Sequence, residues 1–130
     1  MQGVNPVGWF EIYVQDIAAA QKFYETVLGI SMSELPNPTD DPLKMVMFSN
    51  DENTMTQTGS SGAIVQMEGF PSGGNSTIVY FITEDCAVEE SRVVGAGGRV
   101  FKTKFSIGPH GFISLCTDPE GNMFGLHSMK

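Results

Sequence analysis

The amino-acid sequence predicts an α+β fold in which two βαβββ modules form a cupped mixed β-sheet around a central cleft. The first observation is that strand-like and helix-like apolar patterns run through the same order twice. The second is that the two series align without gaps through their first strand and helix, where Asp16 matches Asp85 and Gly29 matches Gly98. The third is the length of 130 residues, which suits a single domain spanning 1–130. Each module leaves an apolar face that the other must cover.

The first module opens on a strand at Gly8–Val14, a segment rich in aromatic and β-branched residues. Asp16 is placed as the N-cap of a helix, whose apolar residues recur at helical spacing until Gly29 closes it. The three prolines of Pro36–Pro42 and the polar segment Asp51–Ser61 predict two loops. The other strands of this module are expected at Ile30–Leu35, Lys44–Ser49 and Ala63–Met67.

The second module repeats the series after Phe70–Ser76, a linker with neither a helix nor a strand pattern. The modules therefore span about 6–69 and 76–129. Asp85 is the expected N-cap of the second helix, which ends in a run of glycines, and the turn Asp118–Asn122 has proline and glycine placed for a tight reversal. The strands of this module are expected at Thr77–Thr83, Arg99–Phe105, Gly111–Thr117 and Met123–His127.

Composition excludes several classes of protein. With 41% hydrophobic and 17% charged residues, the chain is neither disordered nor a coiled coil. The net charge of −8 repels nucleic acid and favours a neutral or cationic partner. The apolar runs are too short to cross a membrane, and the N-terminus has no signal-peptide pattern. Cys86 and Cys116 are too few for a disulfide scaffold, so we expect reduced thiols in a cytoplasmic protein.

Three stretches carry a resemblance to a known superfamily. They are Tyr13–Ile30, Ala96–Phe101 and Asp118–His127, with the sequences YVQDIAAAQKFYETVLGI, AGGRVF and DPEGNMFGLH. With these motifs the chain resembles, over almost its whole length, the vicinal oxygen chelate superfamily, also called the glyoxalase/bleomycin resistance protein/dioxygenase family. The resemblance implies two paired βαβββ modules, a ligand in the cleft of the curved sheet and, as in many members, a homodimer.

The metal-dependent members of that superfamily bind a divalent ion through four histidine or glutamate side chains, one from each of four strands. The resemblance places these positions at Trp9, within Ile64 to Gln66, at Ile78 and at Gly125. Indole, aliphatic and glycine positions offer no side-chain ligand, and Gln66 alone is a weak one. We therefore predict neither a metal nor another cofactor. Lactoylglutathione lyase activity is disfavoured, because charge on an enediolate oxygen would lack a partner.

Strand alternation predicts which side chains line the cleft. If Trp9 points inward, Glu11 and Tyr13 do so as well, while their neighbours in sequence pack under the helix. The expected contributions of the second module are Ile78, Tyr80, Gly125 and His127. An aromatic lining with a few polar groups is typical of a small-molecule site. The structural alternatives are a core anchor for Trp9, half-buried packing for the tyrosines and a solvated strand face for Glu11.

The two histidines of the chain are His110 and His127, at the far ends of the expected last hairpin, so strand pairing places them near each other. Two histidines alone make a poor zinc site. Their structural roles would be a loop residue and a hydrogen-bonded strand residue. The functional alternative is a polar contact to a ligand at the edge of the cleft.

Three functional hypotheses follow. The first is a metal-independent small-molecule-binding protein of the glyoxalase/bleomycin resistance type. The second is a glyoxalase-related lyase or isomerase in which Glu11 is the general base, with a histidine as a candidate electrophile. The third is a regulatory or partner-binding module that keeps the fold without the chemistry of the cleft.

Overall fold

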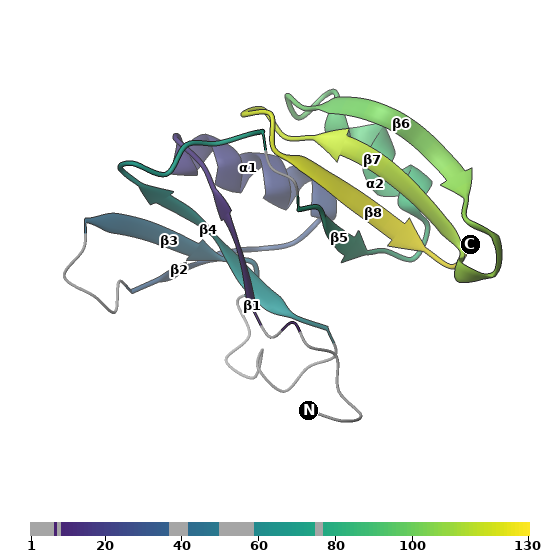
Figure 1. The fold of residues 1–130 in the computed structure, drawn as a ribbon, viewed down its shortest axis with the longest axis horizontal. Helices are drawn as coiled ribbons and strands as arrows, with labels where there is room; N and C mark the ends of the chain where they lie inside the picture. The colour runs from purple at the N-terminus through teal and green to yellow at the C-terminus, as the bar shows by residue number, and fades with distance from the viewer. Residues whose placement is uncertain (1–6, 8, 37–41, 50–58, 75–76) are drawn as a thin grey trace.

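The structure is a computed structural model that describes residues 7, 9–36, 42–49, 59–74 and 77–130. Its elements follow one another in two similar units, which lie side by side in Figure 1. The first unit contains β1 (Trp9–Tyr13), α1 (Ile17–Leu28), β2 (Ser33–Leu35), β3 (Leu43–Met47) and β4 (Ser61–Met67). The second contains β5 (Val79–Ile82), α2 (Cys86–Val93), β6 (Arg99–Ser106), the 3-10 helix η2 (Gly108–His110), β7 (Phe112–Thr117) and β8 (Met123–Ser128).

Each unit has its own four-stranded mixed sheet, with the orders β1-β4-β3-β2 and β5-β8-β7-β6. The first and last strands of each unit are parallel, and the other neighbours are antiparallel. This arrangement confirms the α+β fold with two βαβββ modules. In the described residues the two sheets are not joined by a ladder between β1 and β5. The aromatic rings of Phe10, Phe48 and Phe81 contact one another across this seam.

Both predicted helix N-caps are confirmed. The carboxylate of Asp16 accepts a hydrogen bond from the amide of Ala19, and that of Asp85 accepts one from the amide of Ala87. Gly29 ends α1 in the left-handed conformation at φ 67°, as the sequence predicted. None of the helices in the described ranges is both long and apolar enough to cross a membrane.

The predicted match between Gly29 and Gly98 at the ends of the two helices is wrong. Helix α2 ends at Val93, and Gly98 does not have a left-handed φ. A β-carbon at Gly98 would collide with the carbonyl oxygen of Thr117 and with the ring of Phe23. Glycine is therefore needed at this position because two segments approach each other closely, not because a helix ends there.

The strand predicted at Ile30–Leu35 is shorter than expected. The amide of Ile30 donates to the carbonyl of Glu25, and the amide of Met32 donates to the Glu25 carboxylate, so the chain stays attached to α1 until β2 begins. A 3-10 helix occupies most of the loop predicted at 107–110. Most of the predicted loops Pro36–Pro42 and Asp51–Ser61, and the end of the predicted linker Phe70–Ser76, lie outside the described residues.

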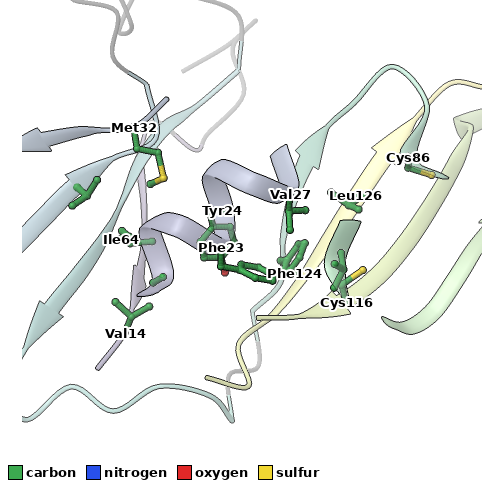
Figure 2. Close-up of a cluster of buried hydrophobic side chains, with 13 residues drawn as sticks. Val14, Phe23, Tyr24, Val27, Met32, Ile64, Cys86, Cys116, Phe124 and Leu126 are labelled. Atoms are coloured by element: carbon green, nitrogen blue, oxygen red, sulfur yellow. The ribbon is translucent and has the colours of Figure 1, made fainter. Parts of the chain in front are cut away.

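One continuous core lies between the helices and the two sheets. Figure 2 shows Phe23 and Tyr24 of α1 between Ile64 of the first sheet and Phe124 of the second. Rings from both units contact one another there, namely Phe10, Phe23, Tyr24, Phe48, Phe81 and Phe124. Both cysteines are free thiols in this core, and burial raises the pKa of Cys116.

Candidate functional site

The open face of β1 carries a hydrogen-bonded group of three side chains. Trp9, Glu11 and Tyr13 alternate with Phe10 and Ile12, so they share one face of the strand. The indole Nε1 of Trp9 donates to Glu11 Oε2 over 3.2 Å, and the Tyr13 hydroxyl donates to Glu11 Oε1 over 2.7 Å. The Glu11 carboxylate is exposed, yet each of its oxygens is held by an aromatic donor.

The hydrogen bond to Glu11 also raises the pKa of Tyr13, and partial burial and the negative charge of Glu11 act in the same direction. The phenol therefore stays protonated and remains a donor at neutral pH. Its ring stacks on Phe70, with ring centroids 4.9 Å apart. The Tyr13 side chain is thus held by Glu11 at its hydroxyl group and by Phe70 at its ring.

The parallel partner β4 forms the floor beside these three side chains. Glu11 is paired with Ala63, and Tyr13 with Val65. These two small residues and Met45 form a second apolar cluster, against which Trp9 and Tyr13 pack. Helix α1 packs against the opposite face of this sheet, so the Trp9–Glu11–Tyr13 group lies on the face that the helix leaves uncovered.

Two hollows lie where the first unit meets the second. The seam hollow, of about 510 Å³, lies between β1 and β5 and is mainly apolar; it is lined by Val7, Trp9, Phe10, Gly59, Ser60 and residues 77–82. The turn hollow, of about 200 Å³, is lined by Glu11, Ile12, Tyr13, Pro71, Gly73, Thr77, Val79, Asn122 and Met123. Because both hollows share Thr77 and Val79, they adjoin each other. The seam hollow has the size of a small-molecule site.

The predicted site residues of the second module are divided between two places. Ile78 and Tyr80 line the seam hollow together with Trp9. The ring of Tyr80 lies directly over Gly125, its partner residue in β8. Ile82 is paired with His127 further along the same strands.

The two histidines do lie together, as the predicted hairpin required. The ring Nε2 of His127 is 2.7 Å from the carbonyl oxygen of His110, so His127 binds the backbone of that residue. Neither histidine lines the seam hollow or the turn hollow. The structure therefore does not bring His110 or His127 next to Glu11.

The side chains at the positions of the superfamily's metal ligands do not suit a metal. Of the predicted range, Ile64 packs in the helix-side core, and Gln66 accepts a hydrogen bond from the amide of Ile17 at the start of α1. Only Val65 of this range lies on the open face. Strand pairing makes Ala63 the counterpart of Gly125, one residue before that range. In the described ranges, no three His, Cys, Asp or Glu side chains gather as a metal site.

The sequence predicted a tight turn at Asp118–Asn122, within one of the motifs that carry the resemblance, but its side chains also connect the two units. The Glu120 carboxylate accepts hydrogen bonds from the amides of Gln15 and Asp16, over 2.6 and 2.9 Å. Asn122 Nδ2 donates to the carbonyl of Tyr13, and Asp118 accepts from the buried hydroxyl of Tyr24 over 2.8 Å.

The polar side chains of the Asp-Pro-Glu-Gly-Asn motif are the feature of the sequence that could have indicated this link between the two units. A tight turn does not itself require a glutamate. The bonds of Glu120 to Gln15 and Asp16 hold the end of β1 against the second unit. They therefore help to position Tyr13 beside the turn hollow.

Comparisons with known proteins agree with this geometry. Residues 7–50 match the family model of the bleomycin resistance protein-like N-terminal region. Two proteins provisionally named glyoxylase CFP32, from Mycobacterium bovis and Mycobacterium tuberculosis, are 30% identical over 123 residues. That alignment covers 91% of this chain but only 43% of each relative, so the chain spans less than half the length of these proteins.

Solved structures share the fold. Glyoxalase I from Zea mays matches with a TM-score of 0.72 and 21% identity, over 95% of this chain and 46% of that one. TnmS3, an antibiotic-binding protein from Streptomyces sp. CB03234, matches with a TM-score of 0.65 and 21% identity, over 98% of both chains. The fold is that of the glyoxalase/bleomycin resistance type. Together with the relatives named above, these matches support a place in the vicinal oxygen chelate superfamily.

Proposed function

We propose that the chain is a metal-independent small-molecule-binding protein that holds its ligand in the seam hollow and against the Glu11 carboxylate. The observation that carries this proposal is the Trp9–Glu11–Tyr13 group, an exposed carboxylate held by two aromatic donors beside an apolar hollow. Aromatic walls bind a flat apolar body, and the carboxylate orients it. Such a site needs no metal to hold its ligand.

The expected ligand is neutral or cationic. No lysine or arginine is among the described residues that line the two hollows, whereas Glu11 lines one of them. The net charge of the whole chain is −8. An organic cation would gain both from the carboxylate and from the faces of neighbouring aromatic rings. An anion would meet repulsion without a compensating partner.

The likeness to TnmS3 and to the bleomycin resistance protein-like family is consistent with binding, but glyoxalase I shares the fold as well, so the residues at the metal positions decide between binding and turnover. TnmS3 is described as an antibiotic-binding protein, and its whole chain superposes on this one. The side chains at the expected metal positions supply no ligand that a metal-assisted reaction would use. We therefore favour binding over a glyoxalase-related lyase or isomerase in which Glu11 is the general base.

Fluorescence of Trp9, the only tryptophan of the chain, tests this proposal directly. The probes are three acridines of similar shape, namely cationic proflavine, neutral acridine and anionic acridine-9-carboxylate. We expect proflavine to bind most tightly and the carboxylate least, with the same Kd in the presence and absence of EDTA. Calorimetry under the same conditions separates binding from optical quenching by the dye.

Glu11→Gln should weaken proflavine binding about tenfold or more, because it removes the charge of the hydrogen-bonded carboxylate. The affinity for neutral acridine should change little. Glu34→Gln is the matched control, since Glu34 is exposed on β2 and lines neither hollow. Equal effects of the two substitutions would contradict a role for Glu11 in the site.

Turnover distinguishes the enzyme from the binding protein. The chain is incubated with the hemithioacetal of methylglyoxal and glutathione, alone and with added Ni²⁺ or Zn²⁺. We expect no turnover above background and no retained metal by elemental mass spectrometry. Turnover that Glu11→Gln lowers by orders of magnitude, or metal bound at one ion per chain, would overturn the proposal.

We also propose that the protein is a homodimer in the cytoplasm. Large apolar side chains outside the two hollows are exposed, among them Phe101 of β6, which is 69% exposed. A second copy could cover such side chains. Free, buried cysteines suit a reducing compartment. Light scattering after size-exclusion chromatography should give twice the chain mass of 14.1 kDa.

A further inference from the structure

Tyr80 occupies an unusual place in the seam hollow, because its ring lies flat on a position without a side chain. Tyr80 and Gly125 are paired residues of the parallel strands β5 and β8. A β-carbon built on Gly125 would overlap three atoms of the Tyr80 ring. Any other residue at position 125 would therefore push this ring away from the sheet and into the hollow.

The backbone of Gly125 does not require glycine. Gly125 lies inside a regular strand and is absent from the positive-φ glycines of the described residues. Its missing side chain therefore matters for space and not for conformation. One face of the Tyr80 ring is supported by the strand, while the side chain as a whole remains 44% exposed.

The opposite strand supplies a second aromatic side chain to the same hollow. Trp9 lines it from β1, and the hydrogen bond to Glu11 fixes the orientation of its indole. Tyr80 is held by the flat surface of β8 beneath it. Two ring systems are thus set in advance on the walls of one hollow of about 510 Å³. Such preorganisation reduces the entropy lost when a flat ligand binds.

We infer that Tyr80, supported by Gly125, is the specificity-determining residue of this site and selects planar aromatic ligands over saturated ones. This inference rests on the proposed function and names the class of ligand that the site takes. A flat ring system lies against the exposed face of Tyr80, and a cationic group attached to it reaches toward Glu11. A compact saturated cation of similar size keeps the charge interaction but gains nothing from stacking.

Two variants and two probes test the inference in the full chain. The probes are proflavine, a planar aromatic cation, and amantadine, a compact saturated cation, with binding measured by calorimetry and by Trp9 fluorescence. Gly125→Ala displaces the ring, Tyr80→Leu removes it but keeps an apolar side chain, and Tyr80→Phe keeps the ring. We expect the first two to weaken proflavine binding about three- to tenfold and to leave amantadine unchanged. Tyr80→Phe should bind proflavine like the wild type.

A second readout does not depend on any ligand. In the folded wild-type protein, the Tyr80 ring should shift the α-proton NMR signals of Gly125 upfield, and Tyr80→Leu should abolish that shift. An unchanged α-proton signal in this variant would overturn the inference whatever the binding data.

The binding data separate two kinds of failure. Proflavine that binds at Trp9 with the same affinity in wild type, Gly125→Ala and Tyr80→Leu would overturn the inference and leave the proposed function standing. Failure of the wild type to bind any of the acridines or amantadine would overturn both. Equal losses for proflavine and amantadine would also overturn the inference, because the effect would then not depend on the flat ring.

Discussion

Each module presses an aromatic ring from its first strand onto a glycine of its last strand, but the two rings face opposite sides. In the first module Phe10 lies over Gly62, and in the second Tyr80 lies over Gly125. Neither glycine has a left-handed φ. Both side chains border the seam hollow, but Phe10 lies on the helix side of its sheet, with its ring centroid 6.0 Å from that of Phe81, whereas Tyr80 lies on the open face.

The difference comes from a shift of one residue along the strand. In the alignment that matches Asp16 with Asp85, the counterpart of Tyr80 is Glu11, not Phe10. Because side chains alternate between the faces of a strand, one position is enough to move a ring from the core to the open face. An aromatic ring packed on a strand glycine thus stabilises the fold in one module and shapes the candidate site in the other.

The largest expected effect tests whether the two modules share one core. Phe124 of β8 is fully buried and contacts Phe23, Tyr24 and Phe81. We expect Phe124→Ala to lower the free energy of unfolding by about 3–5 kcal/mol. Urea denaturation is followed by circular dichroism and by the fluorescence of Trp9, which lies in the other module. If the Trp9 transition stays at its wild-type midpoint, the modules unfold independently and the shared core is refuted.

Two glycine substitutions test whether the rings of Phe10 and Tyr80 have different roles. Gly62→Ala should destabilise by about 1–3 kcal/mol, because the added methyl meets both the backbone oxygen and the ring of Phe10. Gly125→Ala should cost less than about 1 kcal/mol, since the half-exposed Tyr80 can swing into the hollow. Both are measured by urea denaturation. Equal losses in stability would show that the two rings are not used differently.

A smaller effect is expected where the turn of the second module holds the first. Glu120→Ala removes the acceptor for the amides of Gln15 and Asp16 and should cost about 1–2 kcal/mol. The control is Glu84→Ala, which removes a carboxylate whose side chain is 89% exposed. Thermal unfolding of the two variants side by side checks this expectation, and a Glu120→Ala midpoint no lower than that of the control would contradict it.

Local patterns predicted most of the fold. The apolar periodicities gave the type and order of the elements, and Asp16 and Asp85 gave both helix N-caps. The sequence placed the end of α2 too late, because the glycines at 95–98 suggested that the helix ends there. In the structure α2 already ends at Val93. Gly98 is instead required by its approach to Thr117 and Phe23, which lie in other elements. Such contacts between distant segments leave no periodic signal in the sequence.

For the candidate site, too, the sequence predicted the local geometry but not the contacts between distant segments. Strand alternation placed Trp9, Glu11 and Tyr13 on one face, since only local geometry is needed for that. It did not indicate that Gln66 would bind the amide of Ile17, or that His127 would bind the backbone of His110. Gln66 was a weak candidate metal ligand. His127 was a candidate contact to a ligand, with a hydrogen-bonded strand residue as its structural alternative, and both side chains bind a backbone group.

The smallest effect concerns the helix N-caps, which also differ between the modules. Asp85 caps α2 and in addition receives the ammonium of Lys104 at 2.8 Å, whereas none of the ion pairs in the described part of the chain involves Asp16. The hydrogen bond from Lys104 lowers the pKa of Asp85, and the same bond raises the pKa of Lys104. The stabilisation by Asp85 is therefore present above the ordinary pKa of aspartate and is lost as the pH falls through its lowered value.

Asp85→Asn keeps a side-chain acceptor for the helix but removes the charge. We expect it to lower the free energy of unfolding slightly at pH 7, because both partners are partly open to solvent, which screens their attraction. The difference from wild type should shrink as the pH falls to 3, below the ordinary pKa of aspartate, because the unfolded chain then already binds the proton. Urea denaturation at the two pH values measures this, with Asp16→Asn as the control for a cap without an ion pair. A difference for Asp85→Asn that is as large at pH 3 as at pH 7 would show that Lys104 contributes nothing, and the two caps would then be equivalent.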